Sequence, residues 1–324
     1  MIFFFSHYSF INMAQQERLF QQLGRDPLFR DFIHDIVLRM GLSEEQSTVI
    51  ITPTTLMEFA KCFVTRSADP MYNYEMYELT GDTCLNKAVV MYFYTVLQAT
   101  HERKRLREES QGRVFHPDVR MVDYFNKLKA LYISTKEYYD IASRLGFGDF
   151  IRLGPRDVRD EIDKLLEDSF EAFIGCFEVM VDRYIQPYYG HQFVANFIKY
   201  IFTSRHINYH PDLLYDSVTL LKETNDQTRI SITNRDGSVV DGYTHIVEYD
   251  QGTNSLIAYH KNERTKHKTR LHEIPQIYNK SKPSQVEMSK RVLDYLKKYT
   301  DRFPQHMIKL PPTPEELGIE EICV

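Results

Sequence analysis

Five acidic side chains stand at helical spacing in two short stretches of the chain. Glu75, Glu78 and Asp82 lie at i, i+3 and i+7 in EMYELTGD, so a helix would place them on one face. Asp168 and Glu171 are three residues apart in EDSFEAFIG. Like charges at this spacing destabilise a helix by roughly 0.2–0.5 kcal/mol per pair. Hard divalent cations take oxygen ligands and would relieve the repulsion, and paired ions of this kind suit phosphoryl transfer.

The neighbours of these acids leave two interpretations open. Acids at helical spacing usually form a solvated face of a helix. Here, however, Leu79, Leu85 and Val89 border the first group, and the apolar run at 172–174 follows the second. The next residue, Gly175, indicates a close contact between helices. Two acidic groups that border apolar packing can therefore converge on shared cations.

The order of helix and strand signals predicts two domains. From residue 15 to residue 200, apolar residues recur at three- and four-residue spacing, which predicts an all-α domain. After residue 209, a short helical run precedes three β-rich pieces and a final helix, an order typical of a small α+β domain. The three pieces are RISIT (229–233), YTHIVEY (243–249) and SLIAYH (255–260), and the helix runs from Ser284 to Tyr299. We expect the basic stretch KNERTKHKTR (261–270) to be a loop before this helix.

Composition sets broad limits. With 43% hydrophobic residues, the 324-residue chain can bury a substantial core. Its 40 basic and 45 acidic residues do not suggest a nucleic-acid ligand, although local positive charge would suffice for one. The four cysteines are scattered, which indicates neither a zinc cluster nor a disulfide framework but reduced thiols in a cytosol-like compartment. The apolar stretch MIFFFSHYSFIN is too short to span a bilayer, and either a signal peptide or a variable extension before Met13 would explain it.

Several motifs in order resemble the ribonuclease III family. YEMYELTGDTCLNKAVVMYFY is similar to the family signature, and EDSFEAFIGCFEVMVD resembles its second acidic helix. NKLKALYISTKEYYDIASRLGFGDFIRLGPRD resembles the segment that links the two, and FVTRSA (63–68) looks like the helix end before the signature. The resemblance covers roughly Thr52 to Tyr188 and implies the helical endonuclease fold of that family for the first domain. The divergent, Trp-free and Tyr-rich sequence would fit a large DNA virus.

The resemblance implies roles for particular residues. The four core metal ligands of the family fall on Glu78, Asp82, Asp168 and Glu171. Asp82 and Glu171 would be central to catalysis, and Glu75 matches a further acid of the catalytic centre. One more acidic ligand falls on Val122 or Asp123, depending on a one-residue shift after Pro117, and we assign it to Asp123. The implied ion is Mg²⁺, with Mn²⁺ as a substitute.

The C-terminal α-β-β-β-α order resembles a double-stranded-RNA-binding domain. The best local match is DSVTLLKE (216–223), in which Glu223 would face the minor groove. Lysines before the last helix would meet phosphates, and Lys280 and Lys282 stand nearest to the family's positions. The basic stretch 261–270 would either add phosphate contacts or form a solvated loop.

These expectations define a domain plan and a function. Residues 1–14 are an extension, 15–205 the catalytic domain, 209–300 the RNA-binding-like domain, and 301–324 a flexible tail. The resemblance implies a homodimeric endoribonuclease that cleaves double-stranded RNA to 5′-phosphate and 3′-hydroxyl ends. A catalytically inactive scaffold of the same fold in an RNA–protein assembly is the alternative. We expect no membrane partner and a location in the cytoplasm, which would be that of the host, or the virion, if the chain is viral.

Overall fold

The chain divides into two compact units, which are described separately below. The structure, a computed structural model, describes residues 18–115, 121–157, 162–232, 242–250, 255–274, 282–298 and 311–323. The first unit comprises Met1–Val114 and Leu128–Asn208, and the second comprises Phe115–Lys127 and Tyr209–Val324. The expected extension 1–14 lies outside the described residues.

The first unit is helical, as the apolar periodicity predicts. Its described helices are α2 (Leu19–Gly24), α3 (Pro27–Arg39), α4 (Glu44–Ile50), α5 (Pro53–Lys61), α6 (Glu75–Ser110), α8 (Thr135–Leu145), α9 (Ile162–Tyr184) and α10 (Gly190–Thr203), with a short 3₁₀ turn η1 (Phe147–Asp149). A further helix, α7 (Met121–Tyr132), contributes residues to both units. Side chains of Asp26, Ser43, Thr52 and Ser134 accept hydrogen bonds from the first turns of α3, α4, α5 and α8. In the part of the chain that the structure describes, no helix is both long and apolar enough to cross a membrane.

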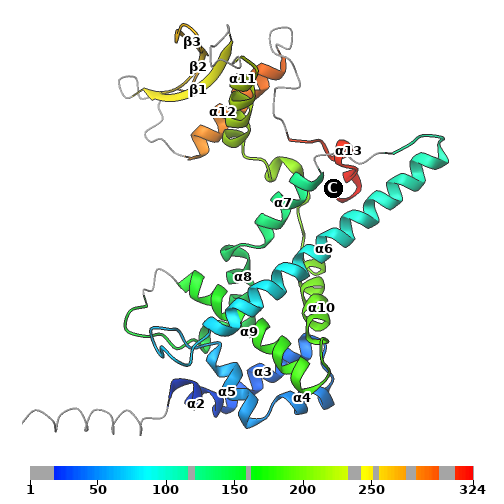
Figure 1. Cartoon of the computed structure of the whole chain (residues 1–324), viewed down its shortest axis with the longest axis vertical. Helices are drawn as coiled ribbons and strands as arrows, with labels where there is room; N and C mark the ends of the chain where they lie inside the picture. The colour runs from blue at the N-terminus through cyan, green and yellow to red at the C-terminus, as the bar shows by residue number, and fades with distance from the viewer. Residues whose placement is uncertain are drawn as a thin grey trace, which may run out of the picture. The chain divides into compact units, whose positions relative to one another are not determined.

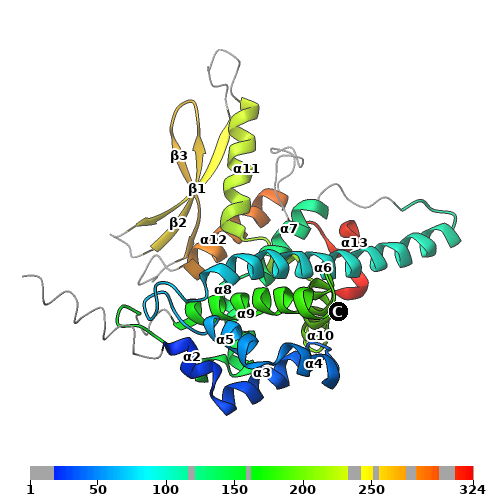
Figure 2. The same ribbon diagram turned by 60° about the horizontal axis from the view of Figure 1, so that its bottom comes forward.

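Helix α9 forms the centre of the first unit. It packs on α6 and α10, and in both views it lies between α6 and the helices α3 to α5 (Figures 1 and 2). An unbroken run from Leu165 to Phe177 is buried, including its polar residues. Phenylalanines from several elements interlock beside it, for example Phe147 with Phe170 and Phe173. The buried run therefore includes three acids of α9, which are Glu167, Asp168 and Glu171.

The second unit contains a three-stranded antiparallel sheet backed by two helices. The elements follow the order α11 (Ser217–Ile232), β1 (Tyr243–Asp250), β2 (Ser255–Asn262), β3 (Lys268–Ile274) and α12 (Lys282–Lys298). In Figure 1, α11 and α12 lie together beside the sheet, and contacts join α11 to β1 and α12 to all three strands. The Asn225 side chain ties α11 to β1, because it donates to the His245 carbonyl oxygen and accepts from the His245 amide.

Two predictions for this unit were wrong, the strand at 229–233 and the loop at 261–270. Residues 229–232 of RISIT belong to α11. This helix packs on α12, and such tertiary packing can outweigh the β-propensity of a short segment. The third strand is instead β3, which begins inside the stretch expected to be a loop. The Asn262 side chain accepts hydrogen bonds from the amides of Arg264 and Thr265, and Lys266 adopts a left-handed φ of 60°. This turn chemistry folds the basic stretch into a hairpin between β2 and β3.

Part of the segment expected to be a flexible tail forms short helical elements. Helix α13 (Pro314–Leu317) begins at Thr313, whose side chain and that of Glu316 form a capping box. A short 3₁₀ turn, η5 (Glu320–Ile322), follows. Leu317 and Ile319 are fully buried, so apolar packing orders this segment.

Candidate metal centre

Two glycines allow α6 and α9 to approach closely where the acids stand. A Cβ atom on Gly81 would collide with the carbonyl oxygen of Glu171, and one on Gly175 would collide with that of Tyr77. Only residues without a side chain permit such backbone contact. The crossing therefore brings the acid-bearing turns of both helices face to face.

Three of the expected ligands meet at this crossing. Ligand oxygens of Glu78, Asp168 and Glu171 all lie within 4.8 Å of one another. Asp168 and Glu171 are buried, with 7% and 6% of their surface exposed, and Glu78 is half-buried. The spacing of these acids was also consistent with a solvated helix face, but in the structure Asp168 and Glu171 are buried. Three carboxylates in so small a volume need compensating positive charge.

Burial and mutual repulsion perturb these carboxylates strongly. Burial, and then the charges of Glu167 and Asp82, raises the pKa of Glu171 to about 8. Burial, followed by the charge of Asp168, raises the pKa of Glu78 to about 7. The site therefore holds protons near neutral pH, and a divalent cation would displace them by neutralising the same charge.

Lys164, Glu167 and Tyr74, which were not predicted from the sequence, complete the surroundings of the site. The Lys164 ammonium lies 2.6 Å from Asp168 Oδ1 and 3.1 Å from Glu167 Oε2. The Tyr74 hydroxyl donates to Asp168 Oδ2 at 3.3 Å, and proximity to Asp168 adds to burial in raising the pKa of Tyr74. Lys164 stands three and four residues before the two acids, a spacing for helical ion pairs that could have identified it.

The donor set fits a hard divalent cation. Glu167 Oε2 and Asp168 Oδ1 are buried and form ion pairs with Lys164. Within the described residues, however, neither oxygen accepts a well-directed hydrogen bond. All three clustered ligands are carboxylates, the donors that Mg²⁺ and Mn²⁺ prefer. The ligand oxygens of Glu78, Asp168 and Glu171 lie close enough together that they could hold such an ion.

The other expected acids lie outside this group of three. Asp82 is half-buried, accepts a hydrogen bond from Asn86 at 2.8 Å, and is close enough to Glu171 to raise its pKa. Glu75 is exposed and pairs with Arg66 at 3.0 Å. Asp123 is exposed in the first turn of α7 and belongs to the second unit, so its assignment remains a prediction.

The expected RNA contacts are placed only in part. Glu223 is exposed on α11, Lys282 is the first residue of α12, and Lys280 lies outside the described residues. The basic hairpin is partly neutralised, because Glu263 pairs with Lys261 at 3.4 Å and with Lys266 at 2.9 Å. These pairs reduce the positive charge that the hairpin offers to a phosphate.

Comparisons with known proteins extend the family resemblance. No protein-family model matches the chain. The chain is 32% identical over 167 residues to "Putative ribonuclease 3" of Invertebrate iridescent virus 6, which covers 52% of this chain and 51% of that protein. It is also 34% identical over 168 residues to a protein of the same name from Frog virus 3 (isolate Goorha). That match covers 51% of this chain and 41% of the viral protein. The chain thus spans about half the length of the curated relatives it matches.

A solved structure of the nuclease domain of ribonuclease III from Campylobacter jejuni is similar to this chain, and the match covers 53% of this chain and 95% of the solved chain. The TM-score of that match is 0.33 and the sequence identity is 18%. The resemblance to ribonuclease III that the motifs indicated is confirmed by the two viral relatives named for that enzyme.

Proposed function

We propose that this chain is an endoribonuclease that cleaves double-stranded RNA by divalent-metal-assisted hydrolysis. The convergence of Glu78, Asp168 and Glu171 carries the proposal, because it gathers hard oxygen ligands from two helices about ninety positions apart in sequence. The names of the viral relatives point to the same reaction class. The products would carry 5′-phosphate and 3′-hydroxyl ends.

Each residue near the crossing has a distinct part in this proposal. When bound, a divalent cation would polarise the scissile phosphodiester and lower the pKa of the attacking water. Glu78, Asp168 and Glu171 would hold the ion, and Asp82 would add negative charge beside Glu171. Lys164 keeps Asp168 in place by an ion pair, so it acts as a positioning residue.

The substrate and the oligomeric state complete the proposal. The α-β-β-β-α order of the second unit supports an RNA-binding role, in which A-form shape is recognised through phosphates and 2′-hydroxyls. Met76 and Leu79 stand on α6 beside the acids with 77% and 70% of their surface exposed. Such exposed apolar side chains support a homodimer through the first unit, because a second copy would cover them.

Cleavage of a long RNA duplex by the purified full chain tests the proposal. Wild-type protein should cut the duplex in Mg²⁺ or Mn²⁺ and not in a chelator. The Glu171→Gln variant keeps the shape of the side chain but loses its charge, so cleavage should fall by at least about 100-fold. Glu45→Gln, which changes an exposed carboxylate on α4, is the matched control and should cut normally.

Binding must be measured on the same duplex to separate the two functions. We expect Glu171→Gln to retain wild-type affinity in a gel-shift assay. Binding without cleavage by the wild-type protein would instead identify a scaffold of this fold. Normal cleavage by Glu171→Gln would show that the acidic crossing is not the active site.

A further inference from the structure

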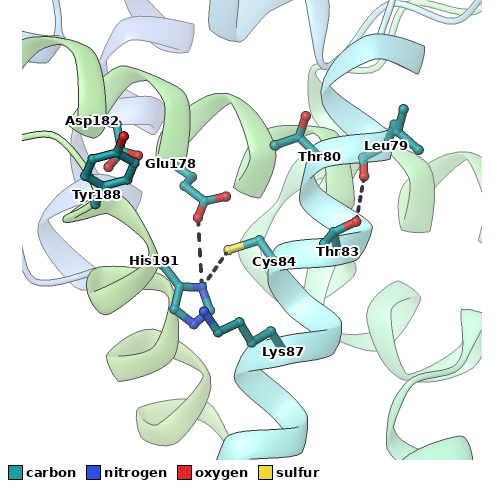
Figure 3. Close-up of a pocket in the computed structure, with 9 residues that line it drawn as sticks. All are labelled: Leu79, Thr80, Thr83, Cys84, Lys87, Glu178, Asp182, Tyr188 and His191. Atoms are coloured by element: carbon teal, nitrogen blue, oxygen red, sulfur yellow. Dashed lines mark hydrogen bonds and ion pairs between the residues drawn. The ribbon is translucent and has the colours of Figure 1, made fainter.

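A second cluster of ligand side chains lies in a pocket farther along the same helices. The pocket has a volume of about 560 Å³, and α6, α9 and α10 contribute residues to it, as does the turn before α10 (Figure 3). At its centre stand a thiol, a carboxylate and an imidazole, from Cys84, Glu178 and His191. Their ligand atoms all lie within 4.8 Å of one another. Spacing along the sequence could not predict this group, because Cys84 and His191 are 107 positions apart.

The backbone holds His191 in place at this pocket. The Gly190 amide donates to Asp182 Oδ1 at 2.7 Å, which ties the start of α10 to α9. A Cβ atom on Gly190 would come within 2.5 Å of the Glu178 carbonyl oxygen, so the close approach requires glycine. Tyr188 adopts a left-handed φ of 63° in the same turn. The imidazole is therefore presented by a turn of defined geometry.

The positions of the Cys84 and Glu178 side chains around His191 favour a set of metal ligands over a catalytic triad. Cys84 Sγ lies 3.3 Å from His191 Nδ1, and Glu178 Oε1 lies 3.9 Å from the same nitrogen. In Figure 3, the dashed lines from Cys84 and from Glu178 both end on that nitrogen. In a nucleophilic triad, the acid and the nucleophile contact opposite nitrogens of the imidazole. Here a thiol, a carboxylate and an imidazole nitrogen lie within 4.8 Å of one another, which is instead typical of ligands around an ion.

We propose that Cys84, Glu178 and His191 form a binding site for a zinc-type transition-metal ion. Sulfur, nitrogen and a single carboxylate oxygen suit Zn²⁺ rather than Mg²⁺, which prefers oxygen alone. With zinc bond lengths of roughly 2.3 Å to sulfur and 2.1 Å to nitrogen or oxygen, tetrahedral ligands stand about 3.4 to 3.6 Å apart. The separations of 3.3 and 3.9 Å match this to within about half an ångström. Because the three ligands line the pocket, a water molecule would complete the four ligands that zinc takes.

Charges around the pocket affect the protonation of its ligands. Burial and the neighbouring Glu178 raise the pKa of the Cys84 thiol, so an ion that binds there would have to displace the thiol proton. Burial and the charge of Lys87 lower the pKa of His191, which leaves a neutral ring nitrogen able to bind a metal. Lys87 lines the pocket and supplies positive charge near Glu178 in the metal-free protein.

The site is separate from the acidic crossing and would reinforce it. Cys84 follows Glu78 by six residues on α6, which is about 9 Å along the helix. Glu178 follows Glu171 by seven residues on α9, which is about 10 Å. An ion bound by all three ligands would join α6, α9 and α10, and would hold together the two helices that carry the carboxylates.

Cobalt titration of the metal-free full chain tests the proposal. Co²⁺ at a thiolate site gives a near-ultraviolet charge-transfer band, whereas carboxylates alone do not. We expect wild-type protein to develop this band at one equivalent and to lose it when Zn²⁺ is added. Cys84→Ser should abolish the band and weaken Zn²⁺ binding, measured by equilibrium dialysis, at least about 100-fold. Circular dichroism verifies that each variant is folded.

Two control variants make the test specific. Cys323→Ser, which removes the half-buried thiol in the second unit, should keep the band. Glu171→Gln should keep it as well, because this assay does not depend on the nuclease proposal. The zinc proposal is overturned if wild-type protein shows no band with excess Co²⁺, or if the band survives in Cys84→Ser. Loss of the band in Cys323→Ser alone would place the thiolate ligand elsewhere.

Discussion

Replacing Glu171 by Gln should stabilise the metal-free protein at high pH. The folded pKa of this buried carboxyl is raised from 4.5 to about 8, so the folded state holds a proton that the unfolded state releases. Stability therefore falls as pH rises from about 4.5 to about 8, and the loss is complete above that range. A neutral amide of the same shape removes the carboxylate charge that causes the loss.

The structure sets the size of this effect. At about 1.4 kcal/mol for each factor of ten in acidity, the rise in the pKa of Glu171 from 4.5 to about 8 gives an upper limit of about 5 kcal/mol. Glu78, Glu167 and Asp168 share the repulsion and can redistribute the proton, so we expect roughly 2 kcal/mol for the single substitution. For a helical unit of this size, that corresponds to a rise in melting temperature of about 4–8 °C.

Thermal unfolding followed by circular dichroism in a chelator measures the prediction. Wild-type protein and Glu171→Gln should melt together at pH 5, where the carboxyl is protonated. At pH 9 the variant should melt at the higher temperature, whereas the exposed control Glu45→Gln should follow the wild type at both values. Equal melting temperatures for wild type and Glu171→Gln at pH 9 would refute the claim that Glu171 is buried among like charges.

Three further results are expected. Mg²⁺ or Mn²⁺ at about 100 times its dissociation constant should stabilise the wild-type first unit by about 2.7 kcal/mol, seen as a higher melting temperature, and should stabilise Glu171→Gln far less. Gly81→Ala should destabilise the chain by at least about 2 kcal/mol in denaturant unfolding, because the new methyl group meets the Glu171 carbonyl oxygen. Gly148→Ala, whose methyl group would enter open space, should change stability by less than about 0.5 kcal/mol. Asn225→Ala should lower the unfolding free energy of the second unit by about 2–4 kcal/mol, because it removes both hydrogen bonds between this side chain and the His245 backbone, and hydrogen exchange at the His245 amide should accelerate.

The sequence by itself determined features that depend on residues near one another along the chain. Features that depend on contacts between distant segments required the tertiary structure. Helical periodicity depends on neighbours three and four residues apart, so the helices that carry the acids were predictable, as were β1, β2 and α12. The third strand was not, because local propensity at 229–232 yields to the packing of α11 on α12.

The candidate sites show the same limit. Spacing put Glu75, Glu78 and Asp82 on one helix face, but it could not decide which of them turns toward Glu171. That choice depends on how α6 crosses α9, and contact between the backbones at Gly81 and Gly175 sets the crossing. The metal-binding potential of Cys84 is likewise a tertiary property. Its two partners stand on other helices, and only the packing of three helices places their donor atoms around one point.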